Sequence, residues 1–281
     1  MNLRTVDYVI NDLATSDGAG VNLTRSVGKN SASRLDPFLM LDYFASDNPD
    51  DYIAGFPPHP HRGFETVTYM VDGTMLHKDH LGNEGLLTSG AVQWMTAGKG
   101  VIHEERPQQE NGLLRGFQLW VNLPAKNKME PANYQQIEPE DMTTIDLATG
   151  GNIRLVAGSL NVDGNAYQGA VSQVTVNPLY ADVTLLAGET VTLPVDQGLS
   201  AFVYPFEGTG SVGNTPLAAG ANVLSTGDHL SITADDRGVR FLLIAGQAIN
   251  EPIAQYGPFV MNTQAEVQQA MQDYNDGVLT D

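Results

Sequence analysis

The stretch "HPHRGFETVTYMVDGT", residues 59–74, decides the fold because it has a counterpart in the second half of the chain. Residues 194–209, "PVDQGLSAFVYPFEGT", align with it without a gap and share its glycine, its tyrosine and its closing acidic-Gly-Thr turn. A second pair of similar segments follows in each half, "SGAVQWMTAG" (89–98) and "AGANVLSTGD" (219–228). Similarity at corresponding places in two halves indicates a duplicated structural unit. We therefore expect two similar domains.

The sequence between its glycines and prolines is typical of short antiparallel strands. These segments are short and rich in Val, Thr, Leu and Tyr, a pattern that indicates a sandwich or barrel. Asp72-Gly73 is a favoured turn dipeptide and predicts a hairpin over residues 65–79. Further strands are expected at 90–95 and 115–124. The predicted fold class is therefore all-β, with two β-barrels.

A polar segment predicts the boundary between the two barrels. Residues 125–145 contain two prolines and few apolar residues, so we expect a linker there. This places an N-terminal barrel in residues 1–130 and a C-terminal barrel in residues 131–281.

Helical signals are concentrated in one segment, residues 262–277. Thr263 and Glu266 have the spacing of a capping box, and Gly277 is a plausible helix stop. We expect a short C-terminal helix that packs outside the barrels, within the C-terminal domain.

Composition and charge exclude cysteine-based sites and argue against several classes of protein. The chain of 281 residues has no cysteine, so a metal site must use histidine and carboxylates. Its net charge of −19 and the absence of a Lys/Arg run argue against direct nucleic-acid binding. No apolar run approaches the ~20 residues of a membrane span, and the N-terminus lacks a signal-peptide pattern. We expect a cytoplasmic monomer.

The first copy of the repeat holds two histidines, His59 and His61, that the second copy lacks. Side chains two apart on a strand lie on the same face, so both rings are expected to point into the barrel. The aligned positions of the second copy are Pro194 and Asp196. Since that copy is expected to fold without them, the histidines are interpreted as functional.

A second pair with the same spacing, His103 and Glu105, lies downstream in "AGKGVIHEERP". Antiparallel strands of a small barrel could bring both pairs together. Three neutral imidazoles and one carboxylate suit a first-row transition metal and leave open positions for water, oxygen or substrate. Fe, Mn, Ni, Cu and Zn all remain open from the residues. The alternative is a buried His/Glu hydrogen-bond network without a metal.

Other polar residues are less well placed for the same site. Glu65 is expected to face inward like His61, because the two are an even number of residues apart. At ~3.3 Å per residue, however, it lies about 13 Å beyond His61 unless the chain bends at Gly63. His77 and His80 are near a Gly-Asn turn and are expected to be solvated. His229 is the only histidine of the second copy, so a matching site there is not expected.

Six blocks in a fixed order resemble the pirin family of the cupin superfamily. They are "DPFLMLDYF" (36–44), "HPHRGFETVTYMVDG" (59–73), "DHLGNEG" (79–85), "VQWMTAGKGVIHEE" (92–105), "GFQLWVNLP" (116–124) and "EPIAQYGPFVMNT" (251–263). The resemblance implies a bicupin, with two jelly-roll-like cupin barrels. It also implies one metal ion, usually iron, in the N-terminal barrel and none in the C-terminal barrel.

The resemblance assigns the metal ligands to the HPH motif and the later H-x-E motif. In this chain they are His59, His61, His103 and Glu105, the same four residues that the spacing suggests.

The resemblance also implies two functions. One is a quercetin 2,3-dioxygenase that opens the heterocycle of a flavonol with O2. Here Glu105 would act as catalytic base as well as ligand. Phe38, Phe56 and Met95 are candidate walls for the aromatic substrate, with ordinary core packing as the alternative for each. The other is a regulatory protein whose metal state controls binding to a protein partner, for which the acidic surface favours a basic partner surface.

Overall fold

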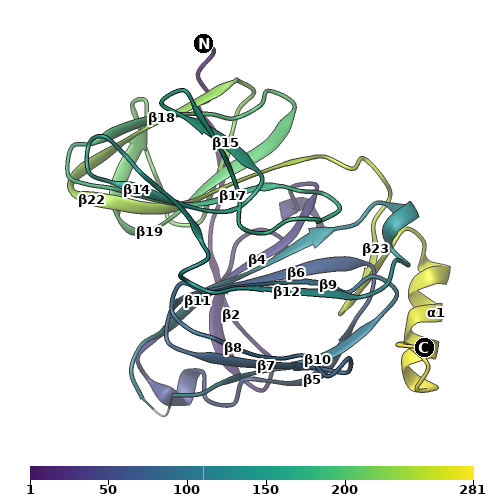
Figure 1. Cartoon of the computed structure of the whole chain (residues 1–281). Helices are drawn as coiled ribbons and strands as arrows, with labels where there is room; N and C mark the ends of the chain where they lie inside the picture. The colour runs from purple at the N-terminus through teal and green to yellow at the C-terminus, as the bar shows by residue number, and fades with distance from the viewer. Residues whose placement is uncertain (110) are drawn as a thin grey trace. The chain divides into compact units, whose positions relative to one another are not determined.

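The structure is a computed structural model that describes residues 1–109 and 111–281. The chain forms two compact units, each built mainly from strands (Figure 1). The first, which we call the histidine unit, comprises Leu13–Glu140 and Ile249–Asp281. The other, the second unit, comprises Met1–Asp12 and Asp141–Ala248. The expectation of two β-barrels is confirmed.

The histidine unit has two antiparallel sheets that enclose a core. The larger, seven-stranded sheet has the order β12 (Asn133–Ile137), β9 (Val92–Thr96), β6 (Phe64–Asp72), β11 (Leu114–Asn122), β4 (Phe38–Ser46), β3 (Val21–Arg25) and β2 (Leu13–Asp17). The smaller, four-stranded sheet has the order β5 (Phe56–His61), β10 (Val101–Pro107), β7 (Met75–Asp79) and β8 (Glu84–Leu87). Short 3-10 helices cover Ser31–Ser33, Pro49–Asp51 and Ala125–Asn127.

Apolar side chains from the two sheets meet in the interior of this unit. Phe44, Met70 and Leu114 of the larger sheet pack with Met75 and Leu87 of the smaller one, and all are at least 96% buried. Burying one such side chain stabilises a fold by about 1.5–3 kcal/mol. Buried and more exposed residues alternate along β8 and β10, which shows that one face of the smaller sheet is turned toward the interior.

The hairpin predicted over residues 65–79 is wrong, although its turn is present. Gly73 has φ +88°, which suits a glycine turn. However, β6 pairs with β9 and β11, whereas β7 pairs with β8 and β10. The turn therefore carries the chain from one sheet to the other. Arg115 fixes its start by donating from Nε to Asp72 Oδ2 at 2.7 Å.

The linker predicted at residues 125–145 is also wrong, because it contains two strands. β12 pairs with β9 at the edge of the histidine unit, and β13 (Thr143–Asp146) pairs with β14 (Asn152–Ala157) in the second unit. An edge strand is half-exposed and tolerates polar residues, which explains the composition of β12.

The predicted division into residues 1–130 and 131–281 assigns each end of the chain to one unit, and the structure places it in the other. β1 (Val6–Ile10) pairs with β21 (Ala221–Leu224) in the second unit. The hairpin of β23 (Ala254–Tyr256) and β24 (Phe259–Met261), and the helix α1 (Gln264–Asn275), belong to the histidine unit. The predicted helix is confirmed with its Thr263–Glu266 capping box, but it packs on the other barrel.

The second unit contains a nine-stranded sheet. Its strands are β1, β21, β19 (Leu199–Val212), β22 (His229–Gln247), β17 (Leu179–Leu185), β14 and β13, with β18 (Thr190–Pro194) on β22 and β20 (Thr215–Pro216) on β19. A hairpin of β15 (Ser159–Val162) and β16 (Asn165–Gln168) completes the unit. Valine, leucine and isoleucine side chains from most of these strands form one buried cluster.

The strand register makes the sequence repeat visible. His59 on β5 lies opposite His103 on β10, and Pro194 on β18 lies opposite His229 on β22. The aligned segments thus occupy equivalent strand pairs in the two units. In the described part of the chain, no helix is long and apolar enough to cross a membrane.

Candidate metal centre

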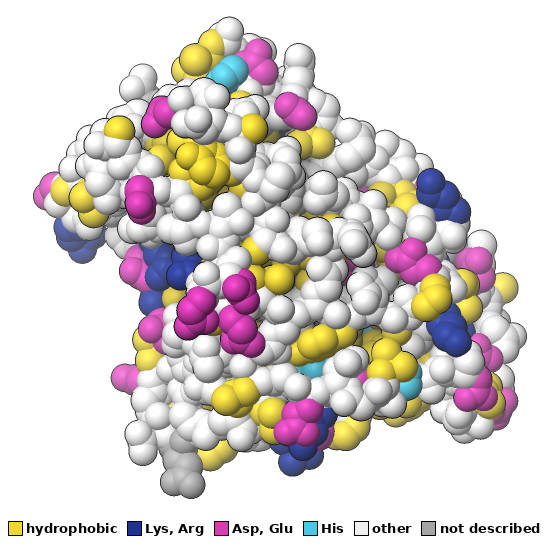
Figure 2. All heavy atoms as spheres, viewed as in Figure 1, with side chains coloured by type: hydrophobic (Ala, Val, Ile, Leu, Met, Phe, Trp, Pro, Cys, Tyr) yellow, Lys and Arg dark blue, Asp and Glu magenta, His cyan; other side chains and the backbone are white. Residues whose placement is uncertain are grey.

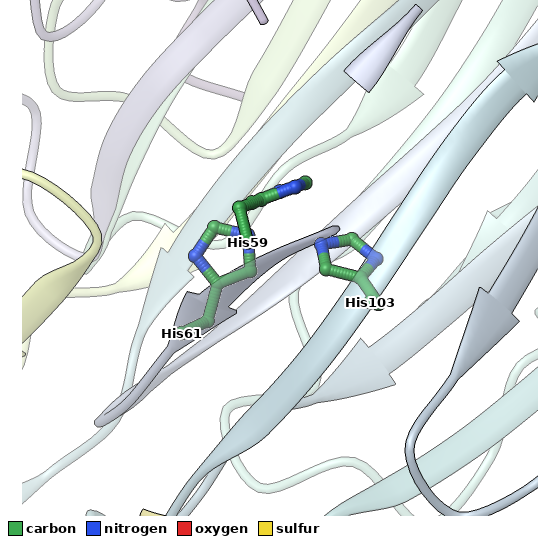
Figure 3. Close-up of side chains that lie close together, drawn as sticks. All are labelled: His59, His61 and His103. Atoms are coloured by element: carbon green, nitrogen blue, oxygen red, sulfur yellow. The ribbon is translucent and has the colours of Figure 1, made fainter. Parts of the chain in front are cut away.

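Two adjacent strands of the histidine unit bring three histidines together. β5 carries His59 and His61, and its antiparallel register with β10 places His103 directly opposite His59. The ring centroids are 4.3 Å apart for His59 and His103, 4.9 Å for His61 and His103, and 4.7 Å for His59 and His61. One nitrogen of each ring lies within 4.8 Å of the others. Figure 3 shows a ring nitrogen of His103 turned toward the other two side chains.

Burial keeps the inner two imidazoles neutral. His61 and His103 are each 2% exposed, and burial lowers the pKa of both well below its ordinary value. The neighbouring histidines lower these pKa values further, and the carbonyl of Pro258 partly opposes this effect at His61. Neutral rings keep a lone pair for a cation.

Nitrogens of the inner rings lack hydrogen-bond partners. Nε2 of His103 has none, and neither ring nitrogen of His61 makes a hydrogen bond of good geometry. Buried polar atoms without partners cost free energy, and a cation would satisfy them. The donor set therefore fits a divalent transition metal.

The carboxylate predicted for this site, Glu105, adjoins the histidine cluster. It is 2% exposed. Its Oε1 accepts a hydrogen bond from Thr68 Oγ1 at 2.8 Å, and its Oε2 accepts one from Gln118 Nε2 at 2.9 Å. With His103 and His77 it forms a second group of ligand atoms within 4.8 Å of one another. His103 is thus common to both groups.

Glu65, the alternative carboxylate, turns away from the site. The expected inward parity of β6 is wrong, because β5 ends at His61 and Gly63 at φ +89° breaks the alternation. Phe64, not its neighbour, reaches the histidines, with its ring 5.1 Å from that of His61. Glu65 instead accepts a hydrogen bond from Thr96 Oγ1 at 2.9 Å.

His77 is the site residue that sequence reasoning missed. We expected it in a solvated turn, but it is fully buried on β7, and its Nδ1 lies 3.3 Å from Nδ1 of His103. The turn begins only after Asp79. The alternation of Met75, His77 and Asp79 was the signal that could have found it. His80 is exposed, as expected.

A cavity of about 540 Å³ opens beside His59 and His61. This volume suits a small aromatic ligand. Of the three predicted walls, only Phe56 lines the cavity, and Phe38 and Met95 are fully buried elsewhere. The other lining residues are Asp17, Gly18, Arg25, Met40, Pro57, Pro58, Gln118, Trp120, Gln255, Gly257 and Pro258.

The chain matches models of known protein families. A model described as Pirin matches residues 20–121, and one described as Pirin C-terminal cupin domain matches residues 180–280. The chain belongs to the pirin family. A Pseudomonas aeruginosa protein provisionally named a quercetin 2,3-dioxygenase is 53% identical, with 94% of each chain covered. A pirin-like protein of Caulobacter vibrioides is 44% identical, with 99% of each chain covered.

The fold of this pirin also matches a solved structure. The crystal structure of a quercetin 2,3-dioxygenase from Acinetobacter baumannii superimposes with a TM-score of 0.89 at 36% identity, covering 99% of this chain and 98% of the other. The predicted bicupin architecture is thereby confirmed.

The Gly of the HPHRG motif fixes the strand junction behind the site. A Cβ atom at Gly63 would lie 2.0 Å from the carbonyl oxygen of Val260, so only glycine fits. The buried Lys128 donates from Nζ to the carbonyls of Gly63 and Val260 and to Asn122 Oδ1, at 2.8, 3.0 and 2.7 Å. Burial lowers the pKa of Lys128 to about 8.

The equivalent position of the second unit has no comparable cluster. Pro194 and Asp196 replace the HPH histidines, and His229 is bound to its neighbour Asp228 at 2.5 Å. Among residues 1–109 and 111–281, the groups with metal-ligand spacing all lie in the histidine unit.

Proposed function

We propose that this pirin is a metal-dependent dioxygenase that opens the heterocycle of flavonols such as quercetin with O2. The observation that carries the proposal is the three-histidine cluster, with two of its rings buried, beside a cavity of flavonol size. The names of the Pseudomonas aeruginosa relative and of the Acinetobacter baumannii structure support it.

His59, His61, His103 and Glu105 are the residues that would hold the metal. We favour Fe(II), the metal that the resemblance to the family implies. Mn, Ni, Cu and Zn are alternatives, because three imidazoles and one carboxylate suit all five metals. When bound, the metal supplies Lewis acidity at the flavonol oxygens and redox chemistry toward O2.

The side chains around the cavity would bind and orient the substrate. Met40, Phe56 and Trp120 offer apolar surface to the flavonol rings. Arg25 and Asp17, which also line the cavity, offer polar contacts to the phenol groups. These contacts would hold the 3-hydroxyl and 4-carbonyl oxygens toward the histidines.

Glu105 is assigned the role of proton acceptor. Its carboxylate would take the proton of the flavonol 3-hydroxyl, since a base must lie within hydrogen-bond reach of that proton. Gln118 lines the cavity and donates to Glu105 Oε2, so it connects the carboxylate to the substrate space. In the overall reaction O2 is consumed, the heterocycle opens, and carbon monoxide leaves with the remaining atoms in an ester of two aromatic acids.

The test uses tag-free protein stripped of metal and reloaded anaerobically with Fe(II). Addition of O2 and quercetin should bleach the flavonol absorption band and release carbon monoxide in proportion to metal content. A His61→Ala variant should do neither. Absence of bleaching with every one of the five metals would reject the proposal.

A regulatory role is the second candidate, and the net charge of −19 favours it. Acidic side chains are spread over the face in Figure 2, with basic ones between them in small groups. Such a surface favours a partner with a basic face. Capture of one such partner by metal-loaded but not metal-free protein, without flavonol turnover, would support this role. The monomeric state and the cytoplasmic location stay predictions.

A further inference from the structure

We propose that Asp79 and His77 form a relay that holds His103 with its Nδ1 protonated and its Nε2 free, so that His77 is a positioning residue for the metal centre. The proposal rests on the proposed metal site. The juxtaposition comes from β7, which pairs with β10 and places Asp79 opposite His103 and His77 opposite Glu105.

The contacts between the two buried histidines require one shared proton. Nδ1 of His77 and Nδ1 of His103 are 3.3 Å apart, and both side chains are at least 98% buried. Two neutral imidazoles can make this contact only if one nitrogen donates a proton and the other accepts it. The direction of donation therefore sets the tautomer of both rings.

Asp79 selects the direction. Its side chain is 1% exposed, and its Oδ2 lies 3.8 Å from Nε2 of His77, within ionic reach but longer than a hydrogen bond. The carboxylate is fixed by hydrogen bonds from the backbone N–H groups of Leu81 and Asn83 to Oδ1 and from Asn83 Nδ2 to Oδ2, at 2.9, 3.0 and 2.7 Å. A carboxylate facing Nε2 favours the proton on that nitrogen.

Proton placement then follows along the chain of contacts. With its proton on Nε2, His77 presents the lone pair of Nδ1, so Nδ1–H of His103 must donate to it. His103 is left with its lone pair on Nε2, the nitrogen that has no hydrogen-bond partner. Figure 3 shows one nitrogen of this ring facing His59 and His61 and the other facing away.

Tyr134 of β12 holds the ring of His77 in place. The two rings are stacked with centroids 5.1 Å apart and an interplanar angle of 29°. The Tyr134 hydroxyl in turn donates to Gln136 Oε1 at 2.5 Å. The contact of His77 with His103 is an outer contact of the kind that fixes the orientation of a metal-binding imidazole. Loss of such a contact weakens metal affinity by about 10–100-fold.

The test compares three variants with the wild type. His77→Leu removes the acceptor, His77→Asn returns an amide oxygen near the position of Nδ1, and the exposed His80→Leu is the matched control. Co(II) affinity is measured by chelator competition, and the His103 tautomer is read in metal-free protein from ¹⁵N-histidine NMR shifts. Thermal unfolding checks that each variant is folded.

We expect His77→Leu to lower Co(II) affinity by about 10–100-fold, with His77→Asn within a few-fold of wild type and His80→Leu unchanged. In metal-free wild type, His103 should carry its proton on Nδ1, and His77→Leu should shift the proton toward Nε2. An unchanged affinity and tautomer in His77→Leu would overturn the relay. So would binding of a second Co(II) that this variant loses, because His77 would then be a ligand.

The relay and the proposed function fail in distinguishable ways. A wild-type protein that binds no metal but shows the Nδ1-protonated His103 tautomer refutes the metal site and keeps the relay. Metal binding with His103 protonated on Nε2 refutes the relay alone.

Discussion

Arg62, the residue after the second histidine of the HPH motif, forms an ion pair of 2.6 Å with Asp273 of the C-terminal helix. The same guanidinium donates to the carbonyls of Lys99 and Leu279. The strand that carries the histidines is thus bonded to the end of the chain. This contact explains why α1 belongs to the histidine unit rather than to the barrel that precedes it in sequence.

Replacing Arg62 should destabilise the protein strongly. Arg62→Met removes the ion-pair partner of the partly exposed Asp273 and the donor to two carbonyls. Each buried acceptor left unsatisfied costs about 1–3 kcal/mol. Urea unfolding measures this change. The exposed pair of Arg106 and Glu104 provides the control, since Arg106→Met should cost less than about 1 kcal/mol. Equal effects of the two substitutions would contradict the anchoring role.

Gly63→Ala should be much more harmful than Gly82→Ala. Both glycines have positive φ, +89° and +85°, but only Gly63 has a backbone oxygen where Cβ would lie. Backbone strain costs about 1–3 kcal/mol at either position, and the clash adds about 1–3 kcal/mol at Gly63. Denaturant unfolding of both variants measures the difference. Similar losses would show that β24 does not fix this junction.

Lys128 should give the stability of the protein a particular pH dependence. Its pKa falls from 10.5 in the unfolded chain to about 8 in the fold. Between these values the unfolded state binds more protons, so the contribution of Lys128 to stability rises with pH from about 8 to 10.5 and is lowest below 8.

The matched variant for this prediction is Lys128→Met, which removes the titrating group. The difference in unfolding free energy between wild type and variant should grow in favour of the wild type across that pH window. Parallel stability curves would mean that the amine titrates normally. At neutral pH the variant should still be less stable, because it leaves the three acceptors of Lys128 without a donor.

Metal should stabilise the wild type and not a variant without the cluster. A ligand at 100 times its Kd adds about 2.7 kcal/mol to the unfolding free energy. We expect this gain on adding Fe(II) anaerobically to stripped wild type, and its reversal by a chelator. The double variant His59→Ala and His61→Ala should show no shift in Tm. A shift of the same size in that variant would place the stabilising ion elsewhere.

Local patterns in the sequence predicted the parts of the molecule that depend on near neighbours. The repeat of residues 59–74 in 194–209 predicted two barrels, and Thr263 with Glu266 predicted the helix start. The two-residue spacing in His59/His61 and His103/Glu105 predicted which strands carry the site. His59, His61 and His103 do meet, and Glu105 adjoins this group through His103.

Features that depend on backbone conformation or distant contacts could not be predicted in this way. The positive φ of Gly63 reverses the parity of β6, which sends Glu65 away and turns Phe64 inward. His77 looked like a turn residue because the turn signals lie just after its strand. The helix α1 belongs to the histidine unit because of long-range contacts such as that of Arg62 with Asp273, which the local sequence does not reveal.

Anomalous diffraction from crystals loaded with a single divalent metal shows where the metal binds in the histidine unit. We expect one strong peak bonded to His59, to His61 and to Nε2 of His103, with a carboxylate oxygen of Glu105 as the fourth protein ligand. A peak between His77, His103 and Glu105 alone, or no peak in this barrel at full loading, would contradict this expectation.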